Sequence, residues 1–67
     1  MLSARNQLPA VIKSVKVGNV MAEVVMEIAG AEIVSAITRG SAEALQLKAG
    51  DRVTAIIKAT EVIVEKE

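Results

Sequence analysis

Apolar and polar positions alternate most clearly over residues 20–28. The apolar positions of one parity are Val20, Ala22, Val24, Met26 and Ile28, and the opposite parity includes Glu23 and Glu27. A period of two is typical of a strand with one buried face. The alanines, methionines and glutamates of this stretch also favour a helix. The alternation and the flanking turns decide for a strand.

Four further strands are predicted, over residues 8–17, 32–38, 52–57 and 62–64. In residues 8–17 the apolar parity changes near Lys13 and Ser14, which indicates a bend or a β-bulge in one long strand. Pro9 suits an edge position or the start of this strand. Gly18 and Asn19, which tolerate positive φ, predict a tight hairpin turn, and residues 29–31 predict the next turn.

One short helix is predicted over residues 41–45. Ser41 is its expected N-cap, and Glu43 lies in the expected first turn, where the helix dipole favours an acidic side chain. Leu45 and Leu47 are expected to point into the core. Five strands with a helix between the third and fourth predict an all-β, five-stranded OB-like barrel, which forms a single domain over residues 1–67.

The small size of the chain favours self-association. Its 67 residues are 52% hydrophobic and include no cysteine, no histidine and no aromatic residue. A chain this short buries only about 60% of its unfolded surface. Without disulfides or a metal, oligomerisation is the simplest source of added stability.

Charge and hydropathy exclude several partners. The chain has eight basic and eight acidic residues, whereas nucleic-acid and membrane-surface binders carry a basic excess. It also lacks the aromatic rings on which single-stranded nucleic acids stack. No apolar run approaches the ~18 residues of a membrane span, and polar residues follow Met1 and Leu2 at once, without a secretory signal. The expected location is the cytoplasm.

Catalysis is not predicted. No nucleophile–base pair can be built with histidine or cysteine, and the carboxylates lack a spacing suited to acid–base chemistry or metal binding. The sequence therefore predicts a protein that is not an enzyme and holds no metal ion.

An anion site is the candidate chemistry that the two ends of the chain support. Arg5 presents a planar fork of donors, and Ser3 lies two residues earlier, on the same side of an extended segment. Lys58 ends an apolar strand, where the backbone N–H groups of Ala59 and Thr60 can add donors. The alternative is a frayed terminus with a solvated lysine.

A second candidate lies at the end of the third strand. Thr38, Arg39 and Ser41 lead into a helix N-terminus, whose N–H groups can bind an anion. Helix capping is the competing explanation. The backbone of Gly18, Asn19 and Val20 offers further donors, although a plain hairpin turn is the favoured explanation of this segment.

The sequence resembles the molbindin (Mop) family. Three segments carry the resemblance, SARNQL at residues 3–8, AEVVMEI at residues 22–28 and IIKATEV at residues 56–62, together with Gly18. This resemblance implies an OB-like barrel that binds molybdate, and often tungstate, in the bacterial cytoplasm. It also implies a homohexamer built as a trimer of dimers, with the oxyanions held by hydrogen bonds at subunit interfaces.

The resemblance also implies roles for individual residues. Ser3, the Ala4 backbone and Arg5 of one subunit would meet Lys58, Ala59 and Thr60 of a neighbour, with Thr38 as a further hydroxyl donor. A second class of site near a symmetry axis is implied, and its candidates are Gly18, Asn19, Val20 and Ser41. The chain departs from the family pattern at three places, namely Ala10 instead of a glycine, Ala59 instead of a serine, and the pair Arg39 and Gly40.

Two functions follow as hypotheses. The first is non-catalytic intracellular binding of molybdate and tungstate for molybdenum storage or homeostasis, with no cofactor besides the oxyanion. The alternative is an OB-like structural or regulatory interaction module without an anion function. An oligonucleotide-binding role is disfavoured by the zero net charge and the absent aromatics.

Overall fold

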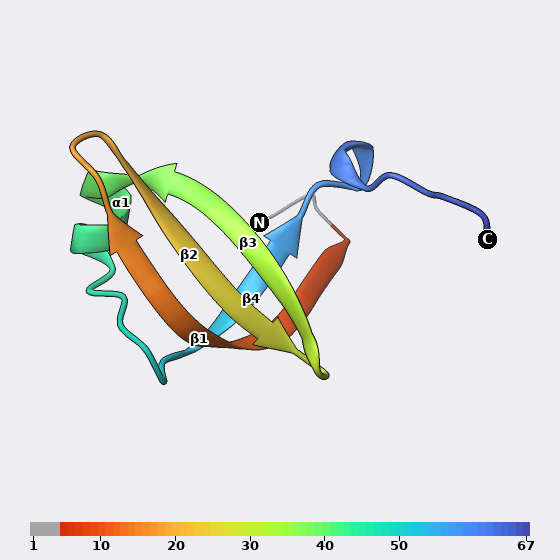
Figure 1. Ribbon diagram of the computed structural model, residues 1–67, viewed down its shortest axis with the longest axis horizontal. Helices are drawn as coiled ribbons and strands as arrows, with labels where there is room; N and C mark the ends of the chain where they lie inside the picture. Colours follow the sequence, from red (N-terminus) through yellow and green to blue (C-terminus); the bar gives the residue numbers. More distant parts are fainter. Residues whose placement is uncertain (1–4) are drawn as a thin grey trace.

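The computed structural model describes residues 5–67, which form one twisted antiparallel sheet with a short helix at its end (Figure 1). The strands are β1 (Asn6–Val17), β2 (Met21–Ile28), β3 (Ala31–Thr38) and β4 (Arg52–Ile57), in the spatial order β3-β2-β1-β4. Helix α1 (Arg39–Ala44) joins β3 to β4, and a single 3₁₀ turn, η1 (Ala59–Glu61), follows β4.

The long strand β1 serves two partners. Its first half, from Asn6 to Val11, pairs with β4, and its second half, from Val11 to Val17, pairs with β2. The register with β2 shifts between Ile12 and Ser14, which confirms the predicted bulge. Because a bulge bends the strand that contains it, β1 can leave one ladder and enter the other.

Pro9 lies in the first half of β1, opposite Thr54 of β4. The ladder between β1 and β2 begins only at Val11. At Pro9, β1 therefore pairs with β4 along one edge and does not pair with β2 along the other. A proline has no N–H to donate to a second ladder. The expected edge position is therefore confirmed.

The two hairpin turns differ. Ile28 pairs with Ala31 around a two-residue loop in which Ala29 has a φ of 49° and Gly30 a φ of 84°, as a type I′ turn requires. Gly18 and Asn19 do not adopt positive φ. Their loop is longer, because the last pair of the β1–β2 ladder is Val17 with Ala22, and loops of this length are built around type I turns.

Helix α1 begins earlier than predicted. Its N-cap is Thr38, whose Oγ1 accepts a hydrogen bond from the Ser41 backbone N–H at 3.1 Å. The expected cap at Ser41 is therefore wrong, and Glu43 lies outside the first turn. Thr38 takes this role because it is the last extended residue of β3 and its hydroxyl stands three residues before Ser41. Leu47 packs against the core as expected, but Leu45 is exposed.

The core lies on the concave face of the sheet. The predicted inward parity of β2 is confirmed, because Ala22, Val24 and Met26 are buried while Glu23 and Glu27 are exposed. Across the residues that the structure describes, the buried apolar side chains are those of Ala10, Ile12, Ala22, Val24, Met26, Ala42 and Ala55. Four of the seven are alanines, so the core of a single chain is small.

The predicted fifth strand does not form within one chain. Residues 62–64 lead away from the sheet (Figure 1), and Ile63 and Val64 are 92% and 88% exposed. The η1 turn redirects the backbone after Lys58, so residues 62–64 pair with neither β3 nor β4. The structure is all-β with one short helix, as predicted, but over residues 5–67 it has four strands and the sheet does not close.

Candidate anion-binding site

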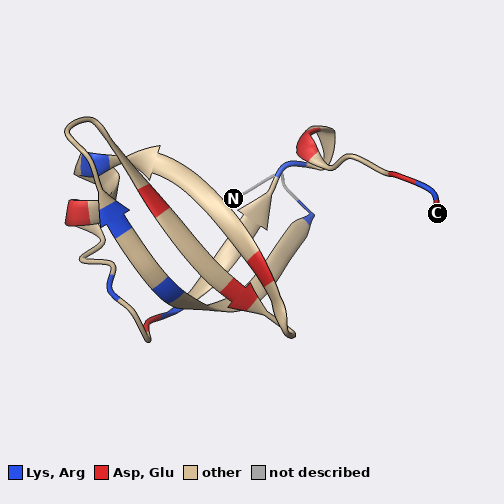
Figure 2. Ribbon diagram, viewed as in Figure 1, with Lys and Arg blue, Asp and Glu red and all other residues tan. Residues whose placement is uncertain are grey.

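The β1–β4 ladder brings two cationic residues to one end of the sheet. Asn6 pairs with Ile57, so Arg5 and Lys58 stand immediately beyond the last pair of the ladder. Both residues are exposed. Figure 2 shows the corresponding positive segments at the start of β1 and just after β4, on the same side of the molecule. Ser3 and Ala4, which precede Arg5 in the expected site, lie outside the described residues.

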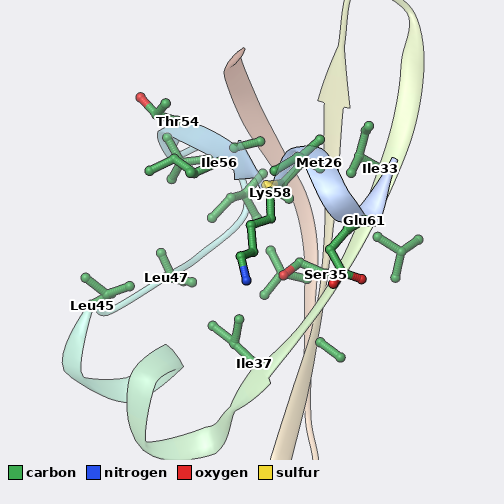
Figure 3. Close-up of a pocket in the computed structure, with 17 residues that line it drawn as sticks. Met26, Ile33, Ser35, Ile37, Leu45, Leu47, Thr54, Ile56, Lys58 and Glu61 are labelled. Carbon is green, nitrogen blue, oxygen red and sulfur yellow. The ribbon is translucent and has the colours of Figure 1, made fainter. Parts of the chain in front are cut away.

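Lys58 extends into an open groove. The groove has a volume of about 620 Å³ and is lined mainly by apolar side chains of β3, β4 and the segment that follows α1. In Figure 3 the Lys58 side chain reaches toward the space between Ile37 and Leu47, and Ser35 and Glu61 border the same groove. Within residues 5–67, Lys58 forms no ion pair.

Ala59 and Thr60 open the η1 turn. The hydrogen bonds that close this turn run from the Glu61 N–H to the Lys58 carbonyl at 2.9 Å and from the Val62 N–H to the Ala59 carbonyl at 3.3 Å. The first N–H groups of a helical turn have no acceptor within it. The backbone donors of Ala59 and Thr60 therefore follow the Lys58 ammonium directly in the chain.

Thr38 lies at the opposite end of the sheet. It pairs with Met21, the first residue of β2, whereas Arg5 precedes the first residue of β1. Its Oγ1 donates a hydrogen bond to Ser41 Oγ at 2.8 Å. The neighbouring Arg39 N–H donates to the Val20 carbonyl at 2.7 Å, which joins the helix to the β1–β2 turn.

The expected anion-binding residues thus fall into two groups in one chain. The first group contains Arg5, Lys58, Ala59 and Thr60. The second group contains Thr38 and Ser41 together with the turn of Gly18, Asn19 and Val20. The whole length of β1, with its 12 residues, separates the two groups.

Sequence reasoning missed the groove that Lys58 enters. Its walls include Ile33, Ser35 and Ile37 of β3 and Val53 and Ala55 of β4, which the alternation assigns to the inner faces of their strands. That pattern identifies these five residues, but Val34, Ala36, Thr54 and Ile56, of the opposite parity, border the groove as well. It does not reveal that the groove between the two outer strands stays open.

Residues 5–67 contain no group of three or more histidine, cysteine, aspartate or glutamate residues placed to hold a metal ion. None of the helices in this range has the length and apolar character needed to cross a membrane.

Comparison with known proteins identifies the family. The TOBE domain family matches residues 2–64. Molybdenum-pterin-binding protein 3 of Clostridium pasteurianum is 48% identical over 64 residues, which cover 94% of each chain. A molybdate-binding protein from Sporomusa ovata has a TM-score of 0.94 at 48% identity, over 98% of both chains. MopII from Clostridium pasteurianum has a TM-score of 0.90 at 45% identity, over 98% of this chain and all of its own. The chain therefore belongs to the TOBE domain family and to the molbindin (Mop) proteins that its sequence resembles.

Proposed function

We propose that this protein binds molybdate and tungstate without catalysing a reaction, and that it serves molybdenum storage or homeostasis in the cytoplasm. The observation that carries the proposal is the likeness to the Sporomusa ovata molybdate-binding protein, at 48% identity and a TM-score of 0.94 over 98% of both chains. The oxyanion itself is the ligand, and no further cofactor is involved.

The charges at one end of the sheet suit a dinegative oxyanion. A tetrahedral oxide presents only acceptor oxygens, and burying its charge requires cations and donors close by. Arg5 supplies a bidentate fork and Lys58 a point charge. The backbone N–H groups of Ala59 and Thr60 add neutral donors, and Ser3 and Ala4 complete the proposed donor set.

The site is proposed to lie between subunits of a homohexamer, arranged as a trimer of dimers. Arg5 and Lys58 are exposed in one chain, and a surface site open to water binds a small anion weakly because solvent screens the charges. A neighbouring subunit that covers this end of the sheet excludes water. Thr38, Ser41 and the turn of residues 18–20 are proposed as donors of a second class of site.

Calorimetric titration of the chain with sodium molybdate tests this function. We expect saturable binding of molybdate and tungstate and a weaker response to sulfate, because the larger oxyanions fill the site better. If neither heat of binding nor protection against melting appears, the proposal is wrong.

Two charge-removing variants test the residues of the site. Arg5→Ala and Lys58→Ala are each expected to weaken molybdate binding about tenfold or more, because hydrogen bonds to charged groups contribute about 1.5–3 kcal/mol. The matched controls are Arg52→Ala and Lys48→Ala, which remove the same charges elsewhere on the chain. Their affinity should stay at the wild-type value.

The same variants separate the proposal from its alternative. An OB-like structural or regulatory module without an anion function would show equal behaviour of the wild type, the two site variants and the two controls toward molybdate. A loss of binding confined to Arg5→Ala and Lys58→Ala supports oxyanion binding.

A further inference from the structure

The groove that Lys58 enters also contains a carboxylate. Among the described residues that line it, Lys58 is the only basic residue and Glu61 the only acidic one. The other lining side chains are apolar, apart from the hydroxyls of Ser35 and Thr54. Charges interact more strongly beside apolar walls than in bulk water, because the local dielectric constant is lower. The Glu61 carboxylate therefore contributes to the potential in which Lys58 would hold an anion.

The η1 turn sets these two charges on one side of the backbone. Lys58 is the N-cap of η1 and Glu61 is its last residue. The Glu61 N–H donates to the Lys58 carbonyl at 2.9 Å. Residues three apart eclipse each other along a 3₁₀ helix. In Figure 3 the Lys58 and Glu61 side chains accordingly extend from the turn in the same direction, into the groove.

The two side chains remain separate charges. The ion pairs within residues 5–67 join Lys13 to Glu32 and Arg39 to Glu43. Three residues of a 3₁₀ turn rise by about 6 Å, which is shorter than the Debye length of about 8 Å at physiological salt. An anion held at this turn is therefore within reach of the Glu61 charge.

Glu61 differs from its neighbours in what it offers an oxyanion. Its N–H is used inside the turn, whereas the first N–H groups of the turn, those of Ala59 and Thr60, have no acceptor within it. An ionised carboxylate only accepts hydrogen bonds, and molybdate, which carries no proton, also only accepts. The interaction between them is consequently repulsive.

We propose that Glu61 is a specificity-determining residue of the oxyanion site, whose carboxylate weakens the binding of dinegative oxyanions more than that of mononegative oxyanions of the same shape. The inference rests on the proposed function, because it concerns the anion that Lys58, Ala59 and Thr60 are proposed to hold. Repulsion from a fixed carboxylate is proportional to the charge of the anion. It is therefore twice as large for tungstate as for perrhenate, a tetrahedral oxide of similar size with a single negative charge. The same repulsion eases the release of a stored dianion.

Calorimetric titration of the Glu61→Gln variant with molybdate and tungstate tests the proposal. Glutamine keeps the size of the side chain and removes its charge. We expect both anions to bind several-fold more tightly than they bind to the wild type. The matched control is Glu23→Gln, which removes the same charge from an exposed position on β2 and should keep the wild-type affinity. Glu61→Asp, which retains the charge, should stay near the wild type.

Perrhenate separates an effect of charge from an effect of shape. Competition titrations against bound molybdate measure its affinity for the wild type and for Glu61→Gln. Because the repulsion scales with charge, the fold-gain for tungstate should be about the square of the fold-gain for perrhenate. Higher ionic strength should reduce both gains.

Three results would overturn this role of Glu61 in a wild type that binds molybdate. They are an unchanged molybdate affinity of Glu61→Gln, an equal gain in Glu23→Gln, and equal gains for tungstate and perrhenate. A wild-type chain that binds no oxyanion refutes the proposed function and the inference with it. Circular dichroism without anion checks that Glu61→Gln is folded. If this variant fails to refold, Glu61→Ser removes the same charge and carries the same expectations.

Discussion

At the scale of single residues, the backbone at Ala29 is the feature that sequence reasoning did not anticipate. Ala29 has a φ of 49°, in the left-handed region, and precedes Gly30 at 84°. This conformation costs an alanine about 1–2 kcal/mol because its Cβ lies too close to the following carbonyl oxygen. Glycine has no Cβ, and asparagine tolerates the conformation because its side chain can form local hydrogen bonds. The type I′ turn is therefore built with a residue that suits it poorly.

Ala29→Asn is expected to stabilise the protein by about 0.5–1 kcal/mol, because Asn-Gly is the favoured pair of a type I′ turn. Urea unfolding at a fixed protein concentration measures the change. The control is Gly30→Ala, which should destabilise the fold, since it places a Cβ at a φ of 84°. An Ala29→Asn midpoint at or below the wild-type value would contradict this account of the turn.

Thr38 is a residue for which two roles can be separated. Its Oγ1 caps α1 by accepting from the Ser41 N–H, and it is also a proposed oxyanion donor. Thr38→Ala should cost about 1 kcal/mol of stability through loss of the cap. Thr38→Ser should retain the cap, and its urea midpoint should stay near the wild-type value.

Titration of these two variants with molybdate then isolates the second role. If Thr38 donates to an oxyanion, Thr38→Ala weakens binding and Thr38→Ser does not. Equal affinities for both variants would leave Thr38 with the capping role alone.

At the scale of the elements, the bulge in β1 has an electrostatic consequence. Glu27 of β2 and Glu32 of β3 face each other directly in the ladder, where like charges repel. Lys13, at the bulge, forms an ion pair with Glu32. The pKa of Lys13 is raised above its ordinary value of 10.5. The largest cause is the hydrogen bond to the Glu32 carboxylate, and the negative charges of Glu32 and Glu27 add smaller contributions. The strand irregularity thus places a cation beside a glutamate pair.

Removal of this cation should destabilise the sheet. Lys13→Met is expected to lower the urea midpoint at pH 7 and low salt, and Glu32→Gln added to it should recover part of the loss by ending the repulsion. The raised pKa sets the sign of the pH dependence. The contribution of Lys13 is complete below the pKa of an unfolded lysine and disappears as the pH rises through the higher folded value. A Lys13→Met midpoint equal to that of the wild type at pH 7 would refute this role.

At the scale of the whole molecule, stability is expected to depend on association. Seven apolar side chains are buried in one chain and four of them are alanines, whereas eleven large apolar side chains of the described residues are exposed. A core of this size gives a small domain little net stability. Contacts between copies, together with the oxyanion that we propose to lie between them, are expected to supply the remainder.

The melting temperature is therefore expected to rise with protein concentration and again with molybdate. A ligand at about 100 times its Kd adds ~2.7 kcal/mol per site when it binds the native state alone. Differential scanning fluorimetry over a dilution series, with sulfate at equal ionic strength as the control, measures both effects. A melting temperature independent of concentration would mean that a single chain is stable by itself.

The sequence by itself determined four of the five expected strands and the inward faces of those four. Alternation in residues 20–28 and the parity change at Lys13 and Ser14 are local signals, because side-chain direction follows from strand geometry alone. The cationic residues Arg5 and Lys58 were likewise readable as candidates, from their chemistry and from the family segments that contain them.

Only the tertiary structure decided how these parts meet. The β1–β4 ladder places Arg5 and Lys58 at the same end of the sheet and Thr38 at the other, and η1 directs residues 62–64 away from the sheet that they were expected to join as a fifth strand. These outcomes depend on pairings between strands far apart in the sequence. A pattern along the chain specifies which face of a strand is apolar, but the partner at each edge is set by the assembled sheet.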